Sequence, residues 1–400
     1  MLLHLRPHLH IIILCICWYA ISSLASQVTK QVLTLCPLPL FLGEFQFLYT
    51  ALLAALSCTM AYYYPSFNNI FPKGTFPEYN RDYNNSDYIT RNSSQQKNII
   101  TRPTKFIFKT VLPLSVFQFV GKYFGHKGTS LVPISTVASI KTLSPLFILL
   151  FQKMLRIKTL PLTKILYFSL FSLVVGVWII VREDSKFSTK NKNNSIGSSS
   201  YGVICAIISM FIFVGQNIYG KKVFTYKSEN QINPTLDRVE DYRENSPLPY
   251  YEGKMKMPEI QPHKPKSYDK LTLMIYISLV GFALSFCWFM ALEFPIIWGH
   301  LFHGTSNDLI QEMPWRLYFL NGTFHFLQAM ITFHLLGEIS TLTYSIANLM
   351  KRIAIISVSW VFVGRSVTLW QIVGLLLNVF GLFLYERCSN KRKQIKSRPE

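Results

Sequence analysis

The chain has 400 residues, of which 50% are hydrophobic, and its formal net charge is +20. A mean hydropathy of +0.26 is too high for an ordinary soluble protein, and the length exceeds that of one membrane hairpin. Because Lys and Arg concentrate in short loops and at the C-terminus, where positive charge sets membrane topology, composition predicts a polytopic membrane protein and argues against a nucleic-acid partner.

The first half of the chain is predicted to cross the membrane about five times, since about 20 apolar residues form one spanning helix. The apolar run that begins at Ile11 ends in small residues that resemble a signal-peptidase site, but a second run follows it directly. We therefore expect a retained helix rather than a cleaved signal peptide. The further spans are expected at Phe41–Tyr62, Phe106–Phe124, Ser130–Leu150 and Thr163–Val181.

The second half repeats this arrangement behind a hydrophilic linker. Residues 225–270 are rich in Pro, Lys, Glu and Asn and contain too few apolar residues for a core. The remaining spans are expected at Tyr201–Tyr219, Leu271–Ile297, Tyr318–Leu336, Ser340–Arg365 and Trp370–Tyr385. The sequence thus predicts an all-α membrane protein of about ten helices.

The expected organisation is two repeats with hydrophilic connections. Both termini are placed in the cytosol, because this orientation leaves most of the Lys and Arg residues on the cytosolic side. The N-x-S sequons at Asn84 and Asn92, which matter only in a lumenal loop, then lie in the cytosol. The segments are a cytosolic N-terminus 1–10, a first repeat 11–182 with a hydrophilic loop 65–104, a lumenal loop 183–200, a second repeat 201–386 with a cytosolic loop 225–270, and a basic cytosolic tail 387–400.

Cations occur in the middle of two of these apolar segments. Lys351 and Arg352 are adjacent within one expected span, and Lys141 lies between Pro133 and Pro145 in another. Charges at that depth are costly and usually face a wet cavity that carries an ion or a substrate. Proline frees backbone groups that need protein or water as partners, which also favours a helix that lines a cavity.

The two halves share a weak internal repeat. The tripeptide Ile-Ser-Thr at Ile134–Thr136 recurs at Ile339–Thr341, and LVVGVWII around Gly176 parallels NVFGLFLY around Gly381. With an odd number of spans in each half, the repeats would insert in opposite orientations. The alignment brings Lys141 and Lys351 to within about a turn of corresponding positions, so two half-sites would supply three cations to one cavity.

Three segments carry a family resemblance: TSLVPISTVASIKTLSPLF, FVGQNIYGKKVF and TLTYSIANLMKRIAIISVSWVFVGRSVTLWQIVGLLLNVFGLFLYER. They resemble the triose-phosphate translocator family of the drug/metabolite transporter superfamily, and most of all its fungal endomembrane, Sly-type branch. The similarity covers most spans and leaves out the two hydrophilic loops. It implies a drug/metabolite transporter fold, with two inverted five-helix repeats.

The resemblance also implies roles for individual residues. Lys141, Lys351 and Arg352 match the family's phosphate clamp, and three cations suit a phosphate dianion. Lys122 stands where plastid members have a histidine, and Gln328 stands where they have a substrate-facing tyrosine. The clamp is therefore kept, while the contacts to the organic part of a substrate differ.

Further candidates have weaker support. Tyr344 and Asn348 lie one or two turns before the Lys351–Arg352 pair and would either extend the site or form hydrogen bonds between helices. His325 and His334 are seven residues apart, which makes a weak metal site, so we expect them to line the cavity or to pack. No catalytic constellation, Gly-rich phosphate loop or cofactor motif is found, so no enzyme, cofactor or metal site is predicted.

The leading hypothesis is a secondary transporter of phosphorylated small metabolites, with inorganic phosphate as an exchange partner implied by the resemblance. A nucleotide-sugar transporter is one alternative, because the superfamily shares its architecture among substrates. A membrane scaffold or adaptor of the early secretory pathway that does not transport is the other. The resemblance places the protein in the membrane of the endoplasmic reticulum or Golgi, and the oligomeric state cannot be read from the sequence.

Overall fold

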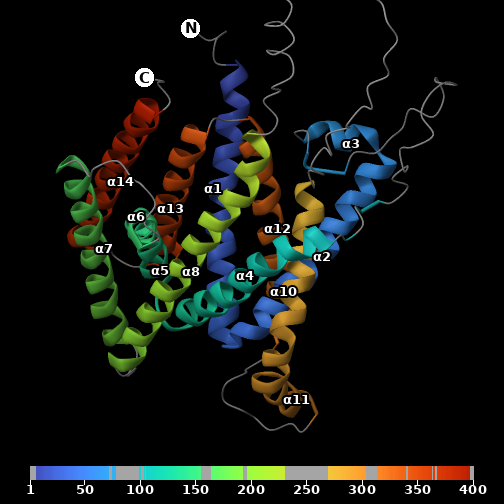
Figure 1. Cartoon of the computed structure of the whole chain (residues 1–400). Coiled ribbons are helices and arrows are strands. Elements are labelled where there is room, and N and C mark those ends of the chain that lie inside the picture. The colour runs from blue at the N-terminus through green and yellow to red at the C-terminus, as the bar shows by residue number, and fades with distance from the viewer. Residues whose placement is uncertain are drawn as a thin grey trace, which may run out of the picture.

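The computed structural model describes residues 6–71, 74–77, 99–100, 103, 105–154, 164–191, 196–229, 269–302, 313–338, 341–362, 364 and 367–396. Most of the expected loop 65–104, most of the linker 225–270 and both sequons lie outside the described residues. Elsewhere the described chain consists of helices joined by short turns (Figure 1).

The first half contains seven described helices. They are α1 (Arg6–Leu35), α2 (Pro39–Tyr63), α3 (Pro65–Ile70), α4 (Lys105–Leu131), α5 (Ile134–Thr142), α6 (Ser144–Met154) and α7 (Lys164–Asn191). The second half contains α8 (Ile196–Glu229), α10 (Lys270–Leu292), α11 (Phe294–Phe302), α12 (Trp315–Glu338), α13 (Thr341–Phe362) and α14 (Leu369–Lys396).

Six of the described helices contain segments that are long and apolar enough to cross a membrane, and the bent pair α5–α6 brings the number to seven if it forms one span. These segments are Leu9–Leu35, Pro39–Tyr63, Lys164–Lys186, Ser199–Gln216, Lys270–Leu292 and Leu369–Cys388. The remaining long helices α4, α12 and α13 have 27, 24 and 22 residues. Some of their described polar side chains, such as Gln118, Gln328 and Arg352, line the cavity described below.

Several expected boundaries were wrong. The helix α4 continues to Leu131, so Lys122 lies well inside it and not at a junction between spans. The fourth span begins only at Ile134, after Pro133, and bends by 41° between α5 and α6. Most of the segment 183–200, expected as a loop, is helical, because α7 extends to Asn191 and α8 begins at Ile196. The basic tail likewise continues α14 as far as Lys396.

The packing of the helices is symmetric when the two halves are exchanged. The series α1, α2, α4, α5–α6, α7 corresponds in order to α8, α10, α12, α13, α14. The contact between α4 and α8 then has its counterpart in α12 and α1, and the pairs α2–α10, α5–α13 and α7–α14 map onto themselves. Figure 1 shows that α1 descends from the side of the termini whereas α8 rises towards it, and that the described ends of α1 and α14 lie on the same side.

The contact between α7 and α14 supports the sequence alignment of the halves. A Cβ on Gly176 would lie 2.7 Å from the carbonyl oxygen of Gly374, and the Ser169 hydroxyl donates to the carbonyl oxygen of Gly381 at 2.7 Å. The alignment that pairs Gly176 with Gly381 also pairs Ser169 with Gly374. Exchanging the halves therefore converts one of these contacts into the other, as a two-fold relation requires.

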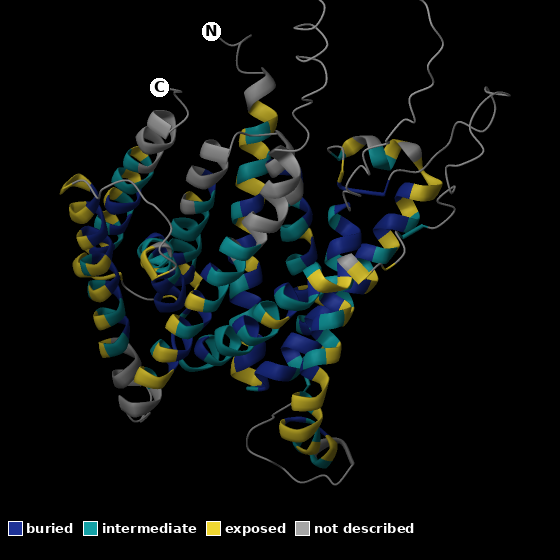
Figure 2. Cartoon of the chain, viewed as in Figure 1, coloured by how far each residue is buried: buried dark blue, intermediate teal, exposed yellow. Residues whose placement is uncertain are grey.

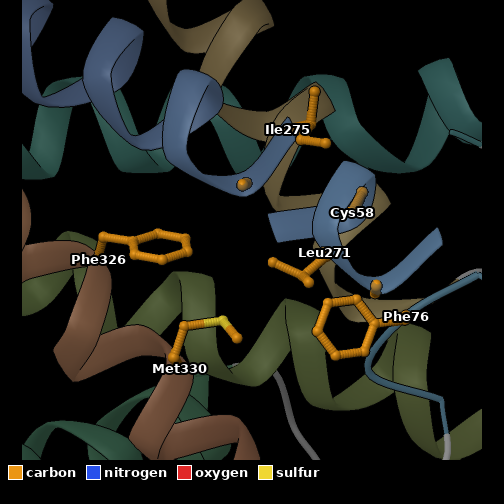
Figure 3. Packing of buried hydrophobic residues seen from close by; sticks show 8 residues of the cluster. Cys58, Phe76, Leu271, Ile275, Phe326 and Met330 are labelled. Atoms are coloured by element: carbon orange, nitrogen blue, oxygen red, sulfur yellow. The ribbon is translucent and has the colours of Figure 1, made fainter. Parts of the chain in front are cut away.

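Apolar side chains occupy both the interior and the outer faces of the bundle. Figure 2 shows exposed residues along the outer sides of the helices. Large apolar side chains are among the exposed residues, for example Phe171, Trp178 and Leu376. In lipid such faces are satisfied, so helix association depends on close packing and hydrogen bonds. One interior cluster joins α2, α10 and α12 through Cys58, Leu271 and Phe326, with Phe76 beside them (Figure 3).

Candidate functional site

The centre of the bundle contains a cavity of about 740 Å³ between the two halves. Helices α2, α4, α5 and α6 of the first half line it together with α8, α10, α12 and α13 of the second. A second cavity of about 400 Å³ adjoins it, on the side of α1 and of the turn between α4 and α5. Both cavities are lined by Gln118, Lys122, Lys141, Phe213, His325, Gln328, Lys351 and Arg352.

The three predicted clamp residues come together where the two cavities meet. Arg352 of α13 donates through Nη1 to the carbonyl oxygen of Lys141 and to Oγ of Ser144, the latter at 2.9 Å. The backbone explains why this carbonyl accepts a side chain: Pro145, four residues further on, has no N–H to offer it. The helix break between α5 and α6 thus creates a binding point for Arg352, which crosses from one half to the other.

Lys351 approaches the same place from the other face of α13. Its Nζ lies 4.2 Å from the centroid of the Trp18 ring, and Trp18 of α1 is fully buried. The ammonium of Lys351 lies near enough to Lys141 and Arg352 for these like charges to repel one another. Since none of the described residues that line the two cavities is acidic, these cations leave a strongly positive interior. An anion inside the cavity would be attracted to them.

Lys122 and Gln328 line both cavities, and Asn348 lines the smaller one. Lys122 is 7% exposed, so its side chain is buried inside the bundle. Tyr344 lies in α13, but its side chain is outside the described part of the structure. The sequence placed these residues near the clamp only through spacing and resemblance, and the structure shows which of them reach the cavity.

The two histidines of α12 have different surroundings. His325 lines both cavities, whereas the ring of His334 packs against those of His10 and Phe71, with centroids 5.8 Å apart in both cases. Among the described residues, no group of three or more His, Cys, Asp or Glu side chains is placed to hold a metal ion.

Sequence reasoning missed two glutamines in the cavity wall. Gln216 of α8 donates through Nε2 to Oε1 of Gln118 of α4 at 2.7 Å. Gln118 lies four residues before Lys122, so both are on one face of α4. This spacing was the available signal, because two polar residues on one face of a membrane helix indicate a polar environment on that face.

Beside the smaller cavity, on the side opposite the termini, a charged residue joins α1 to the end of α4. Lys30, near the end of α1, donates through Nζ to the carbonyl oxygens of Thr129, Ser130 and Val132 at 2.6, 3.1 and 3.0 Å. These carbonyls belong to the C-terminal end of α4 and its turn, where a cation complements the helix dipole. Lys30 therefore holds α1 against the turn between α4 and α5.

A buried carboxylate secures the other side of the same turn. Asp184 of α7 accepts hydrogen bonds from the Ser135 and Thr136 hydroxyls at 2.5 and 2.8 Å, in the first turn of α5. Its second oxygen accepts from Nε2 of Gln371 of α14 at 2.9 Å. An anion at a helix N-terminus complements the dipole, so the Ile-Ser-Thr motif serves to fix the start of α5.

The apolar helices and the cation-lined cavity define a multi-span membrane protein with an interior suited to anions. Comparison with known proteins gives the family: residues 9–240 and 253–386 match the profile of the Triose-phosphate Transporter family. The chain therefore belongs to the Triose-phosphate Transporter family.

Three relatives illustrate the range of similarity. The Saccharomyces cerevisiae protein named uncharacterized transporter YJL193W is 62% identical over 99% of this chain and 98% of its own length. Uncharacterized transporter SLY41 of the same yeast is 32% identical over 96% and 82%. Glucose-6-phosphate/phosphate translocator 2, chloroplastic, of Arabidopsis thaliana is 24% identical over 70% and 58%.

Proposed function

We propose that the protein is a secondary transporter that moves phosphorylated small metabolites across a membrane by alternating access of its two halves. The observation that carries this proposal is the convergence of Lys141 from one half with Lys351 and Arg352 from the other, at the point where the two cavities meet. The Arabidopsis thaliana relative is named glucose-6-phosphate/phosphate translocator 2, which supports phosphate as the shared part of the ligand.

The proposed architecture has ten spans in two inverted five-helix repeats. It counts α4, α12 and α13 as spans in addition to the six apolar helices and the α5–α6 pair. The symmetric helix contacts and the opposite directions of α1 and α8 support it. The positive-inside bias places both termini in the cytosol, and the similarity to SLY41-type relatives underlies the proposed location in the endoplasmic reticulum or Golgi.

The chemistry of the clamp suits a phosphate group. A guanidinium can bind two phosphate oxygens, and an ammonium supplies a compact point charge. In the structure Nη1 of Arg352 donates hydrogen bonds at the break between α5 and α6, and these bonds fix the direction of its side chain. An empty cavity with several unbalanced cations should resist closing, which is the physical reason to propose inorganic phosphate as the counter-substrate.

Uptake of labelled phosphate into proteoliposomes loaded with phosphate or a phosphorylated metabolite tests the proposal. We expect Lys351→Ala and Arg352→Ala to lower uptake at least tenfold, since each removes a charge-assisted contact of about 1.5–3 kcal/mol. Lys186→Ala, which removes a surface lysine that pairs with Glu183 at 2.6 Å, is the control. If both clamp variants transport as well as the parent, the assignment is wrong.

A nucleotide-sugar transporter is the second candidate, and the size of the cavity favours it. A volume of about 740 Å³ exceeds what a three-carbon phosphate fills and is typical of sites for larger ligands. A thermal-shift panel that compares sugar nucleotides with small phosphates separates the two substrate classes. A scaffold or adaptor that does not transport would instead keep its cellular role after loss of all three clamp cations.

A further inference from the structure

A buried carboxyl that the phosphate clamp does not use lies in the wall behind Lys122. Glu44 of α2 is 4% exposed, and neither of its carboxyl oxygens has a hydrogen-bond partner among the described residues. Ser285 of α10 lies beside it, but the Ser285 hydroxyl donates to the carbonyl oxygen of Gly281 at 2.8 Å. A buried carboxylate without donors is costly unless a cation pairs with it. The charge of Glu44 should therefore depend on where the nearest cation lies.

That cation is Lys122 of α4. Lys122 and Glu44 interact electrostatically but form no direct ion pair in the structure. The Lys122 ammonium lies instead 4.2 Å from the centroid of the Phe47 ring, and Phe47 is one turn beyond Glu44 on α2. The side chain is long and flexible, so the movement that would exchange the Phe47 contact for an ion pair with Glu44 is a change of rotamer.

The other titratable groups on the helices around α2 do not compete for this role. On α4, His126 makes a 3.3 Å contact with Oε1 of Gln46. On α12, His325 lines the cavities. On α10, the carboxylate of Glu293 accepts from the backbone N–H groups of Leu40 and Phe41 at 3.0 and 2.7 Å. Lys122 is therefore the cation available to neutralise Glu44.

We propose that Glu44 is a proton-binding site that couples the movement of the anion to that of a proton. When Glu44 is ionised, Lys122 pairs with it, so the empty cavity presents one cation fewer and closes more readily than with all four unbalanced. When Glu44 takes a proton from water on the loading side, Lys122 turns to the cavity and binds the anion with the clamp. After the anion leaves on the other side, Lys122 returns to Glu44 and the proton passes to water there.

This inference rests on the proposed function and adds net, proton-coupled transport to it. A transporter whose empty cavity keeps all its unbalanced cations would resist closing without an anion. It would therefore exchange one anion for another and would not transport anions in one direction only. The pair formed by Lys122 and Glu44 removes one of those charges without an anion. Proton coupling and net transport are therefore expected together.

The experiment uses proteoliposomes containing the full-length chain, with the membrane voltage clamped. Phosphate/phosphate exchange is measured at equal pH, and net phosphate accumulation is measured with the outside one pH unit more acidic. For one proton per anion, we expect the gradient to raise accumulation in the parent by up to about tenfold over that in Glu44→Gln. Glu44→Gln, a mimic of the neutral acid, should keep exchange. Because both proteins meet the same phosphate species, the ionisation of phosphate cancels in the comparison.

The matched control is Glu183→Gln on α7, a half-buried glutamate that pairs with Lys186 outside the cavities and should behave as the parent. The proton site is refuted if Glu44→Gln accumulates phosphate in response to acid as the parent does. It is also refuted if the parent exchanges phosphate but shows no acid-driven accumulation. In both cases the proposed transport function stands. If Glu44→Gln also loses exchange, Glu44→Asp decides: we expect the pH of half-maximal uptake to shift, and an unchanged value refutes the inference. Absence of any phosphate exchange by the parent refutes the proposed function itself.

Discussion

Replacing Lys30 by Met should open the cavity on the side opposite the termini. Lys30 donates three hydrogen bonds to carbonyl oxygens at the end of α4, and methionine keeps most of the side-chain volume while removing every donor. No hydrogen bond would then hold α1 to the turn between α4 and α5 through this residue. The closed arrangement is thereby weakened relative to an open one.

The magnitude follows from the bonds lost. Charge-assisted hydrogen bonds contribute about 1.5–3 kcal/mol each, but Lys30 regains water contacts when this side opens, so the net loss is about 2–4 kcal/mol. This corresponds to a shift of roughly 30-fold to several hundred-fold in the equilibrium towards the open state. A state populated at about 1% in the parent would become substantial in Lys30→Met.

Thiol labelling measures this shift directly. Ala138 lines the smaller cavity and not the larger one, so a cysteine at this position reports access from the closed side. We expect a membrane-impermeant maleimide applied from that side to label Ala138→Cys at least tenfold faster in the Lys30→Met background than in the parent background. Lys186→Met controls for the loss of a surface lysine. Equal labelling rates in the Lys30→Met and parent backgrounds would refute the role assigned to Lys30.

Two further substitutions probe the helix contacts. A Cβ at Gly374 would lie 2.9 Å from the carbonyl oxygen of Gly176. Gly374→Leu should therefore lower the free energy of unfolding by about 1–3 kcal/mol, which is measured as a lower Tm. Gly43→Ala is the control and should leave Tm unchanged, because nothing lies within 4 Å of a Cβ at that position. Pro145→Ala restores a backbone N–H that competes with Arg352 for the carbonyl oxygen of Lys141. We expect this variant to take up phosphate more slowly than the parent while its thermal stability is unchanged. Uptake equal to that of the parent would contradict the role assigned to this hydrogen bond.

The sequence predicted the apolar spans and the cavity cations because both depend on properties of single segments. Apolar length marks a spanning helix, and a cation in the middle of such a run needs a polar environment wherever the helix packs. The structure brings Lys141, Lys351 and Arg352 to one cavity on this basis. Their role in binding phosphate stays a prediction, since no ligand contact supports it.

The boundary of α4 could not be read in the same way. Gly125 and Gly128 lie beyond the expected end of this span at Phe124, and between membrane helices such small residues allow close approach. A Cβ on Gly128 would lie 3.1 Å from the backbone nitrogen of Ala206, so this stretch packs on α8 and remains helical. With the expected end at Phe124, Lys122 would lie near the end of the span, whereas in the structure it lies well inside α4.

Single carboxylates are another feature that only packing resolves. Glu44 and Asp184 each lie near the end of an apolar run, where an interfacial location is the simplest expectation. In the structure both carboxylates are buried. Asp184 accepts hydrogen bonds from hydroxyls of α5, and Glu44 interacts electrostatically with Lys122. Which neighbours they meet depends on contacts between segments far apart in sequence, and no local pattern records those.

The location of the clamp fits alternating access because it belongs to neither half alone. Arg352 bonds the backbone of Lys141 across the division between the halves, so under the proposed mechanism the cations would stay together at the join while each side opened in turn. The contacts of Lys30 and Asp184 hold the turn between α4 and α5 and involve none of the three cations. A ligand held by the clamp would therefore change the side it faces without leaving its site, provided that the two ends of the cavity do not open together.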